Sequence, residues 1–135
     1  MSVVNVNGVN ISYADEGQGE PILFLHGLGI SQRDWSPQIE YFRQNYRVLA
    51  PDFRGHGDSD KPDADYSIAL HSADMVGLMD ALKLESAHVV GLSMGGMVAF
   101  QLAVDAPSRL RSMTIVNSGP ALPIPLLQRK CSGRA

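Results

Sequence analysis

The sequence predicts an α/β fold, in which a mostly parallel sheet with helical crossovers is entered by an antiparallel hairpin. Short apolar runs rich in β-branched residues alternate with longer segments of helical apolar spacing through most of the chain. Two runs of alternating apolar and polar residues precede them, separated by Asn7 and Gly8, a dipeptide typical of a two-residue hairpin turn. With 135 residues, 44% of them hydrophobic and 19% charged, the chain is long enough for one core, so we expect one domain.

The predicted strands are short, and the later ones are apolar throughout, as in parallel sheets that helices cover on both faces. The run at residues 21–25 is the clearest case, because it contains no polar side chain. In chain order, we expect strands over residues 3–6, 9–13, 21–25, 47–50, 87–92 and 112–116.

Three helices are predicted between these strands. The first covers residues 35–45, with Asp34 as its N-cap. Its apolar residues have the helical spacing that places them on one face. The second covers residues 68–82, where Ser67 supplies the cap and apolar residues form an inward stripe. The third follows residue 93 and ends before Pro107.

The stretch Gly91-Leu92-Ser93-Met94-Gly95 joins a predicted strand directly to a predicted helix. This is the context in which a G-x-S-x-G sequence forms a nucleophile elbow. A serine at so sharp a corner takes a strained backbone conformation, and Gly91 and Gly95 leave room where the chain comes close to itself. The helix N-terminus behind Ser93 favours a developing oxyanion, with the N–H of Met94 as the expected donor. The alternative is a glycine-rich turn that only packs a helix closely onto a strand.

Three motifs in this order resemble the signature of the α/β-hydrolase family. They are Leu25-His26-Gly27-Leu28-Gly29, Asp52-Phe53-Arg54-Gly55-His56-Gly57-Asp58-Ser59 and Val90-Gly91-Leu92-Ser93-Met94-Gly95-Gly96. Within the family, the chain is most similar to small esterases and enol-lactonases. The resemblance implies the first six strands of the family sheet, in the spatial order 1, 2, 4, 3, 5, 6. It also implies that the N–H of Leu28 joins that of Met94 in an oxyanion hole.

The same resemblance predicts an incomplete hydrolase. In the family, the catalytic acid follows the seventh strand, or the sixth in some members, and the catalytic histidine follows the eighth. Here the residues after the sixth predicted strand are Asn117 and Ser118, and asparagine cannot serve as the carboxylate. We therefore expect residues 1–120 to form a truncated hydrolase core and residues 121–135 to be a tail, unassigned in structure, at the expected start of a cap.

Ser93 needs a base, because a serine hydroxyl is a weak nucleophile at neutral pH. His88 precedes it by five residues on one strand, roughly 16 Å away at the rise per residue. His71 is expected to face solvent or to pack on its helix, and His26 to make a structural hydrogen bond. His56 leaves two possibilities. Either Ser93, His56 and Asp52 form a local triad, or Asp52 pairs with Arg54 to hold the loop while His56 fills a turn.

A dinucleotide-binding site is an alternative interpretation of the glycines after the strand at residues 21–25. Asp52 at the end of the next strand fits such a site. However, Gln32 occupies the position of the third glycine that the fingerprint needs, so this interpretation is disfavoured. We expect no cofactor and no metal.

The composition limits the classes of molecule that this chain is expected to bind. A net charge of −3 without a Lys/Arg cluster argues against nucleic acid and against an anionic membrane surface. The single cysteine, Cys131, has no partner for a disulfide or a metal site, and no run approaches membrane-spanning length, so a cytoplasmic location is expected. The resemblance places the sixth strand at an edge of the sheet, and because that strand is low in charge we expect self-association through this edge.

The sequence thus predicts part of a serine hydrolase that acts on a small carboxylic ester or lactone through an acyl-enzyme on Ser93. The chain alone is expected to be inactive, because the base and its orienting acid are missing. The second hypothesis is a binding or vestigial protein that keeps the pocket without catalysis.

Overall fold

A six-stranded sheet with the order β1-β2-β4-β3-β5-β6 organises residues 1–119, which the computed structural model describes. This is the strand order that the family resemblance implied. In chain order, the elements are β1 (Ser2–Val6), β2 (Val9–Glu16), β3 (Pro21–Leu25), a 3-10 turn η1 (Gln32–Trp35), α1 (Ser36–Phe42), β4 (Arg47–Pro51), α2 (Ile68–Ala81), β5 (Ala87–Leu92), α3 (Met94–Asp105), η2 (Pro107–Arg109) and β6 (Leu110–Val116). The predicted tail at residues 121–135, with Cys131, lies outside the described residues.

The predicted hairpin is confirmed at its turn. β1 and β2 pair antiparallel, and the turn residues Asn7 and Gly8 have φ of 51° and 83°. Positive φ at both positions is what a two-residue hairpin turn requires. β2 then pairs antiparallel with β4, whereas β3 pairs parallel with β4 and β5, and β5 pairs parallel with β6.

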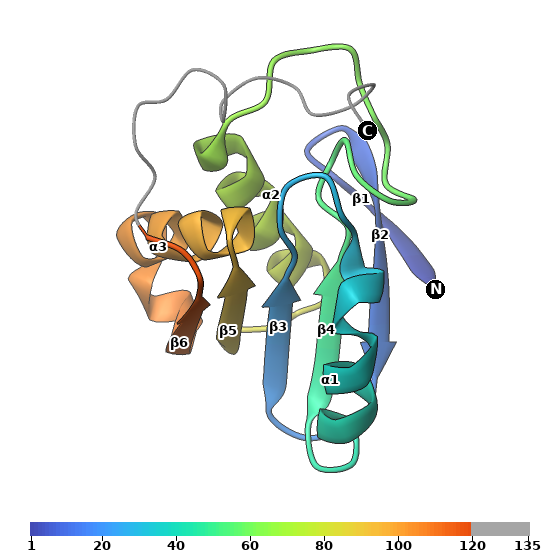
Figure 1. Cartoon of the computed structure of the whole chain (residues 1–135), viewed down its shortest axis with the longest axis vertical. Helices are drawn as coiled ribbons and strands as arrows, with labels where there is room; N and C mark the ends of the chain where they lie inside the picture. The colour runs from blue at the N-terminus through green and yellow to red at the C-terminus, as the bar shows by residue number, and fades with distance from the viewer. Residues whose placement is uncertain (120–135) are drawn as a thin grey trace.

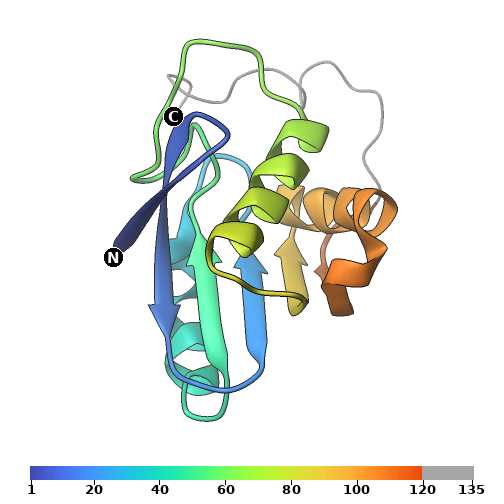
Figure 2. The ribbon, with the colours of Figure 1, turned by 180° about the vertical axis from the view of Figure 1, so that it is seen from behind.

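Helices cover the sheet on two faces (Figures 1 and 2). α2 and α3 pack on one face in a core with Leu23, Leu25 and Val89, whereas α1 packs on the other face over Ile22 and Phe24. Alternate residues of β3 therefore enter different cores, which explains why this strand is apolar throughout. Figure 1 shows no helix of the described chain in front of β5 and β6 on the α1 side.

The prediction of Asp34 as a helix N-cap was wrong. Ser31 is the capping residue instead, and its Oγ accepts from the N–H of Arg33 at the start of the 3-10 turn. The regular helix α1 begins only at Ser36, because Trp35 turns inward to stack 4.8 Å from Phe24 between ring centroids. By contrast, Ser67 caps α2 as predicted, with its Oγ accepting from the N–H of Leu70 at 3.0 Å.

β6 is an edge strand among the described residues, because it pairs only with β5. Four of its central side chains are exposed, and Met113 and Val116 each keep 37% of their surface accessible. Unpaired N–H and C=O groups on such an edge can template pairing with another chain. Self-association through this edge stays a prediction.

Candidate active site

Ser93 lies at the corner between β5 and α3 in a strained backbone conformation. Its φ and ψ are 53° and −114°, in a region that residues other than glycine rarely adopt. The surrounding chain holds it there, because its N–H donates to the carbonyl of Val116 at 3.0 Å and its own carbonyl accepts from the N–H of Gly96 at 2.9 Å. The Ser93 side chain is exposed, and its Oγ makes no hydrogen bond within residues 1–119. The corner therefore presents a free hydroxyl to solvent.

The two elbow glycines lie where the chain comes closest to itself. A Cβ on Gly91 would lie 2.6 Å from the carbonyl carbon of Gly95 and 2.7 Å from the Cα of Gly96. A Cβ on Gly95 would lie 2.6 Å from the carbonyl carbon of Leu25 and 2.7 Å from the carbonyl oxygen of His26. Both sites are bounded by backbone, which cannot move aside as a flexible side chain can. The sharp turn thus depends on both glycines.

The loop after β3 lies against Ser93. A Cβ on Gly27 would lie 3.5 Å from the Cβ of Ser93, so the N–H of the next residue, Leu28, is close to the elbow. The N–H of Leu28 makes no hydrogen bond within the described residues. Met94 is the first residue of α3, where a backbone N–H has no acceptor inside the helix. Leu28 and Met94 thus flank Ser93, and their roles in an oxyanion hole stay predictions.

Ser118 is a contact that the sequence analysis missed. Its Oγ donates to the carbonyl of Ser93 at 2.5 Å, and its side chain fills the space beside Gly96, where a Cβ would lie 2.5 Å from that of Ser118. The neighbouring Asn117 has a φ of 48°. The available signal was positional, because residues after β5 and β6 meet at the carboxyl edge of a parallel sheet.

His26 makes the structural hydrogen bonds that were predicted for it. Its Nδ1–H donates to the carbonyl of Gly27 at 2.7 Å, and its Nε2 accepts from the N–H of Phe53 at 3.0 Å. One donor and one acceptor are the pattern of a neutral imidazole. His26 therefore joins the loop after β3 to the loop after β4 and is not available as a base.

The described residues do not form the local triad of Ser93, His56 and Asp52. The carboxylate of Asp52 accepts from the backbone N–H groups of Gln32 at 2.8 Å and Asp58 at 3.0 Å. The Nδ1 of His56 lies 3.2 Å from the carbonyl of Arg54, and its Nε2 has no hydrogen-bond partner within the described chain. Asp52 thus shapes the loop, and His56 fills a turn.

Arg54 does not pair with Asp52, which corrects the second possibility for this loop. Its guanidinium makes a bidentate ion pair with Asp74 on α2. The Nε donates to Oδ2 at 2.7 Å, and the Nη2 donates to Oδ1 at 2.9 Å. Both side chains are buried, and Asp74 also accepts from the amide of Asn7 at 3.1 Å. The pair therefore joins the loop after β4 to α2 and to the hairpin turn.

His71 is buried, so the expectation that it packs on its helix is confirmed and the one that it faces solvent is wrong. Its ring lies 4.9 Å from that of Phe53 and 6.3 Å from that of His56, while His56 lies 5.0 Å from His26. Burial, together with the charge of neighbouring His56, lowers the pKa of His71 and of His26 to about 3. The pKa of His56 is also lowered, chiefly by burial.

We expect this histidine cluster to make folding acid-sensitive. The unfolded chain binds protons on these histidines near pH 6.5, whereas folded His26 and His71 stay neutral down to about pH 3. Their stabilisation is therefore complete above pH 6.5 and is lost as pH falls toward 3, by about 1.4 kcal/mol per unit for each histidine. Urea unfolding at pH 7.0, 6.0 and 5.0 measures this slope. A His71→Phe variant should lose about half of it. An unchanged midpoint at pH 5.0 would contradict the prediction.

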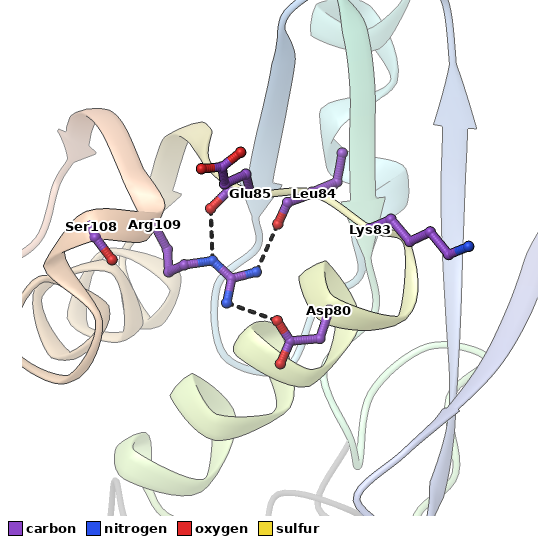
Figure 3. Close-up of a pocket in the computed structure, with 6 residues that line it drawn as sticks. All are labelled: Asp80, Lys83, Leu84, Glu85, Ser108 and Arg109. Atoms are coloured by element: carbon purple, nitrogen blue, oxygen red, sulfur yellow. Dashed lines mark hydrogen bonds and ion pairs between the residues drawn. The ribbon is translucent and has the colours of Figure 1, made fainter.

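A polar pocket lies at the other end of the sheet (Figure 3). It has a volume of about 440 Å³ and is lined by Asp80, Lys83, Leu84, Glu85, Ser108 and Arg109. The guanidinium of Arg109 lies at the centre of the pocket. It already forms an ion pair with Asp80 and donates hydrogen bonds to the carbonyls of Leu84 and Glu85. The pocket lies before β5 and β6 begin, whereas Ser93 follows the end of β5, so the two sites are separate.

Within residues 1–119, no group of three or more His, Cys, Asp or Glu side chains is arranged to hold a metal ion. No helix in the same residues has both the length and the apolar character needed to cross a membrane. Neither finding adds a feature to the site around Ser93.

Comparison with known proteins identifies relatives across most of this chain. The sequence profile of the alpha/beta hydrolase fold matches residues 20–131. A solved N-acyl homoserine lactone degrading enzyme is 44% identical, with a TM-score of 0.85 over 87% of this chain and 46% of its own. The enol-lactonase from Burkholderia xenovorans LB400 is 34% identical, with a TM-score of 0.84 over the same shares. A putative carbamate hydrolase of Azorhizobium caulinodans is 39% identical over 87% of this chain and 44% of its own.

These matches have two features in common. This chain covers only 44% to 46% of the length of these three relatives. The matched part includes β3, the elbow and β6, which are the elements that position Ser93. The motifs, the strand order and the profile agree, and the chain therefore belongs to the α/β-hydrolase fold family.

Proposed function

We propose that this chain supplies the nucleophile and the oxyanion hole of a serine hydrolase that cleaves carboxylic esters or lactones. The observation that carries the proposal is the strained, exposed Ser93 at the N-terminus of α3, beside the loop that holds Leu28. Strain of this kind persists only where the surrounding structure imposes it, and it is common at catalytic residues. A turn that only packed a helix on a strand would not need to expose a hydroxyl.

In the proposed reaction, the Oγ of Ser93 attacks the acyl carbon while a base removes its proton. The N–H groups of Leu28 and Met94 stabilise the oxyanion, and losing one such donor typically costs about 3 to 4 kcal/mol in the transition state. The alcohol leaves with the proton, and an acyl-enzyme on Ser93 remains. Water then attacks the acyl-enzyme, which releases the carboxylic acid and restores the hydroxyl.

The base and its orienting acid come from outside the described residues in this proposal. Within residues 1–119, His26 is neutral with both ring nitrogens bonded, and His88 bonds Glu20 and Ser112 instead. The family resemblance places both missing groups after later strands. The proposal is therefore that this chain alone is catalytically incomplete.

The substrate class is supported by the solved relatives. One is described as degrading an N-acyl homoserine lactone and the other as an enol-lactonase. Both descriptions name a cyclic ester, whose carbonyl suits a serine nucleophile with an oxyanion hole. For this chain we propose the same class, a small ester or lactone, as the carbonyl compound that reaches Ser93.

The test is a chimera in which residues 1–119 are joined to the C-terminal portion of the matched enol-lactonase. We expect an ester substrate to leave an acyl group on Ser93, seen by mass spectrometry after acid quenching. Ser93→Ala should abolish that adduct and leave folding nearly unchanged, because it removes one exposed hydroxyl. Ser108→Ala, at another exposed serine, is the control and should keep the adduct. Unimpaired ester turnover by the Ser93→Ala chimera would exclude Ser93 as the nucleophile.

A further inference from the structure

A second serine, Ser112 on β6, makes a hydrogen bond to a histidine. The Oγ of Ser112 lies 2.7 Å from the Nδ1 of His88 on β5, and the Nε2 of His88 lies 2.9 Å from the Oε1 of Glu20 just before β3. His88 and Ser112 are partners in the parallel register of β5 and β6, so their side chains leave the same face of the sheet. The hydroxyl of Ser112, the imidazole of His88 and the carboxylate of Glu20 thus form a continuous chain of hydrogen bonds.

The carboxylate determines which ring nitrogen of His88 carries the proton. An ionised carboxylate only accepts hydrogen bonds, so the Nε2 of His88 must be the donor to Glu20. In the neutral ring, Nδ1 is then an acceptor, and the hydroxyl of Ser112 donates to it. The same logic orients the histidine of a serine hydrolase triad, although there the ring is reversed and Nε2 faces the serine. A basic nitrogen therefore faces this hydroxyl.

His88 and Arg111 both favour the ionised form of Glu20. The guanidinium of Arg111 lies 2.9 Å from Oε1 of Glu20 and is itself held by the Oγ of Ser86 at 3.0 Å. Hydrogen bonds from His88 first, and then from Arg111, lower the pKa of the Glu20 carboxyl. The ring of Tyr46 lies edge-on to that of His88, with 6.5 Å between the ring centroids. The base is oriented by its hydrogen bonds to Glu20 and Ser112.

The hydroxyl of Ser112 is also accessible. Ser112 is exposed on β6, and Figure 1 shows no helix of the described chain over this part of the α1 face. His88 keeps 31% of its side chain exposed. Within the described chain, a small acyl donor can therefore approach the hydroxyl without a conformational change.

We propose that Ser112, activated by His88 and oriented through Glu20, is a second acylation site that takes acyl groups from small activated esters. The Oγ of Ser112 bonds to the acyl carbon, the ester bond to the leaving alcohol breaks, and the Ser112 proton passes through His88 Nδ1 to that alcohol. Water then cleaves the acyl-serine to a carboxylic acid with the same base. Ser112 lies within a strand and has no helix N-terminus behind it, so neither acylation nor hydrolysis of the acyl-serine gains oxyanion stabilisation from a helix dipole, and turnover at this site is slow.

Acylation of Ser112 does not require Ser93, because His88 lies near the start of β5 and Ser93 follows its end. The test treats the full chain with p-nitrophenyl acetate and maps acetyl groups by peptide mass spectrometry. General-base assistance typically contributes 10²- to 10⁴-fold, so we expect Ser112 to acetylate at least about tenfold faster than Ser108. Ser108 is the internal control, because it is exposed and has no histidine partner among residues 1–119.

His88→Gln separates activation from a purely structural hydrogen bond. Glutamine can still bond Ser112 and Glu20 but cannot take a proton at this pH, so acetylation of Ser112 should fall to the Ser108 rate. Glu20→Gln should lower it in part, and Ser93→Ala should leave it unchanged. Equal labelling of Ser112 and Ser108, or labelling of Ser112 that persists in His88→Gln, would overturn the proposal. Labelling at Ser93 alone would support the proposed function and refute this inference.

Discussion

The isolated 135-residue chain is expected to hydrolyse esters at Ser93 at a rate close to background. The oxyanion hole and binding alone leave a residual acceleration of about 10³ to 10⁴ over water when triad members are missing, a loss of roughly 10⁶ in kcat. Within the described residues, Ser93 Oγ has no hydrogen-bonded base, so this loss should apply in full. The rate at Ser93 is measured as steady-state turnover of an activated ester by the Ser112→Ala chain. This variant removes any contribution from acylation of Ser112 on β6.

Adding a separately made C-terminal portion of a related hydrolase, with its acid and histidine, should restore turnover if the two pieces associate. The control is the same mixture with Ser93→Ala, which should stay at background. A local triad of Ser93, His56 and Asp52 predicts the opposite result, in which the isolated chain is already active. If the isolated monomer exceeds its Ser93→Ala control and loses that rate on His56→Ala, the base lies within this chain.

The parts of the fold that the sequence predicted are those with a local signal. Asn7 and Gly8 marked the hairpin turn, because few dipeptides accept positive φ at both positions. The run at residues 21–25 became β3 with the same bounds, since five apolar residues in a row, too short for a helix of usual length, suit a strand covered on both faces. The elbow was predictable because strand, glycines and helix follow one another directly in the chain.

The parts that the sequence did not predict depend on contacts between distant segments. Asp34 has the chemistry of an N-cap, but the burial of Trp35 against Phe24 moved the start of the helix. The partner of Arg54 is Asp74, which lies on a different element and reaches it only because α2 packs across the loop. Nothing in the order of residues favours that partner over the nearer Asp52.

The site was predicted in the same uneven way. The glycine spacing located Ser93 and the neighbouring loop, whereas Ser118 escaped notice because its contact with Ser93 arises only when β6 docks beside β5. The histidines show the limit most clearly. His88 was set aside because it lies far from Ser93, yet the pairing of β5 with β6 gives it a serine of its own.

Replacing Gly95 with valine is expected to unfold this chain, and the chimera that carries it. The first atom of any side chain would lie 2.6 Å from the carbonyl carbon of Leu25 and 2.7 Å from the carbonyl oxygen of His26. Relief would require α3 to move off the end of β3, which would open the core beneath Leu25 and Val98. Losses above about 4 kcal/mol arise from steric conflicts of this kind, and they approach the whole stability of a small domain.

Gly119→Val is the matched control, because no atom lies within 4 Å of a Cβ at that position and its backbone is not left-handed. Urea unfolding followed by circular dichroism should show the cooperative transition in Gly119→Val and in Ser93→Ala, and none in Gly95→Val. The contrast matters because Ser93 and Gly95 are two residues apart in the same turn. If Gly95→Val kept a native transition and lost only ester turnover, the close approach of α3 to β3 would be wrong, and with it the place of Leu28 beside Ser93.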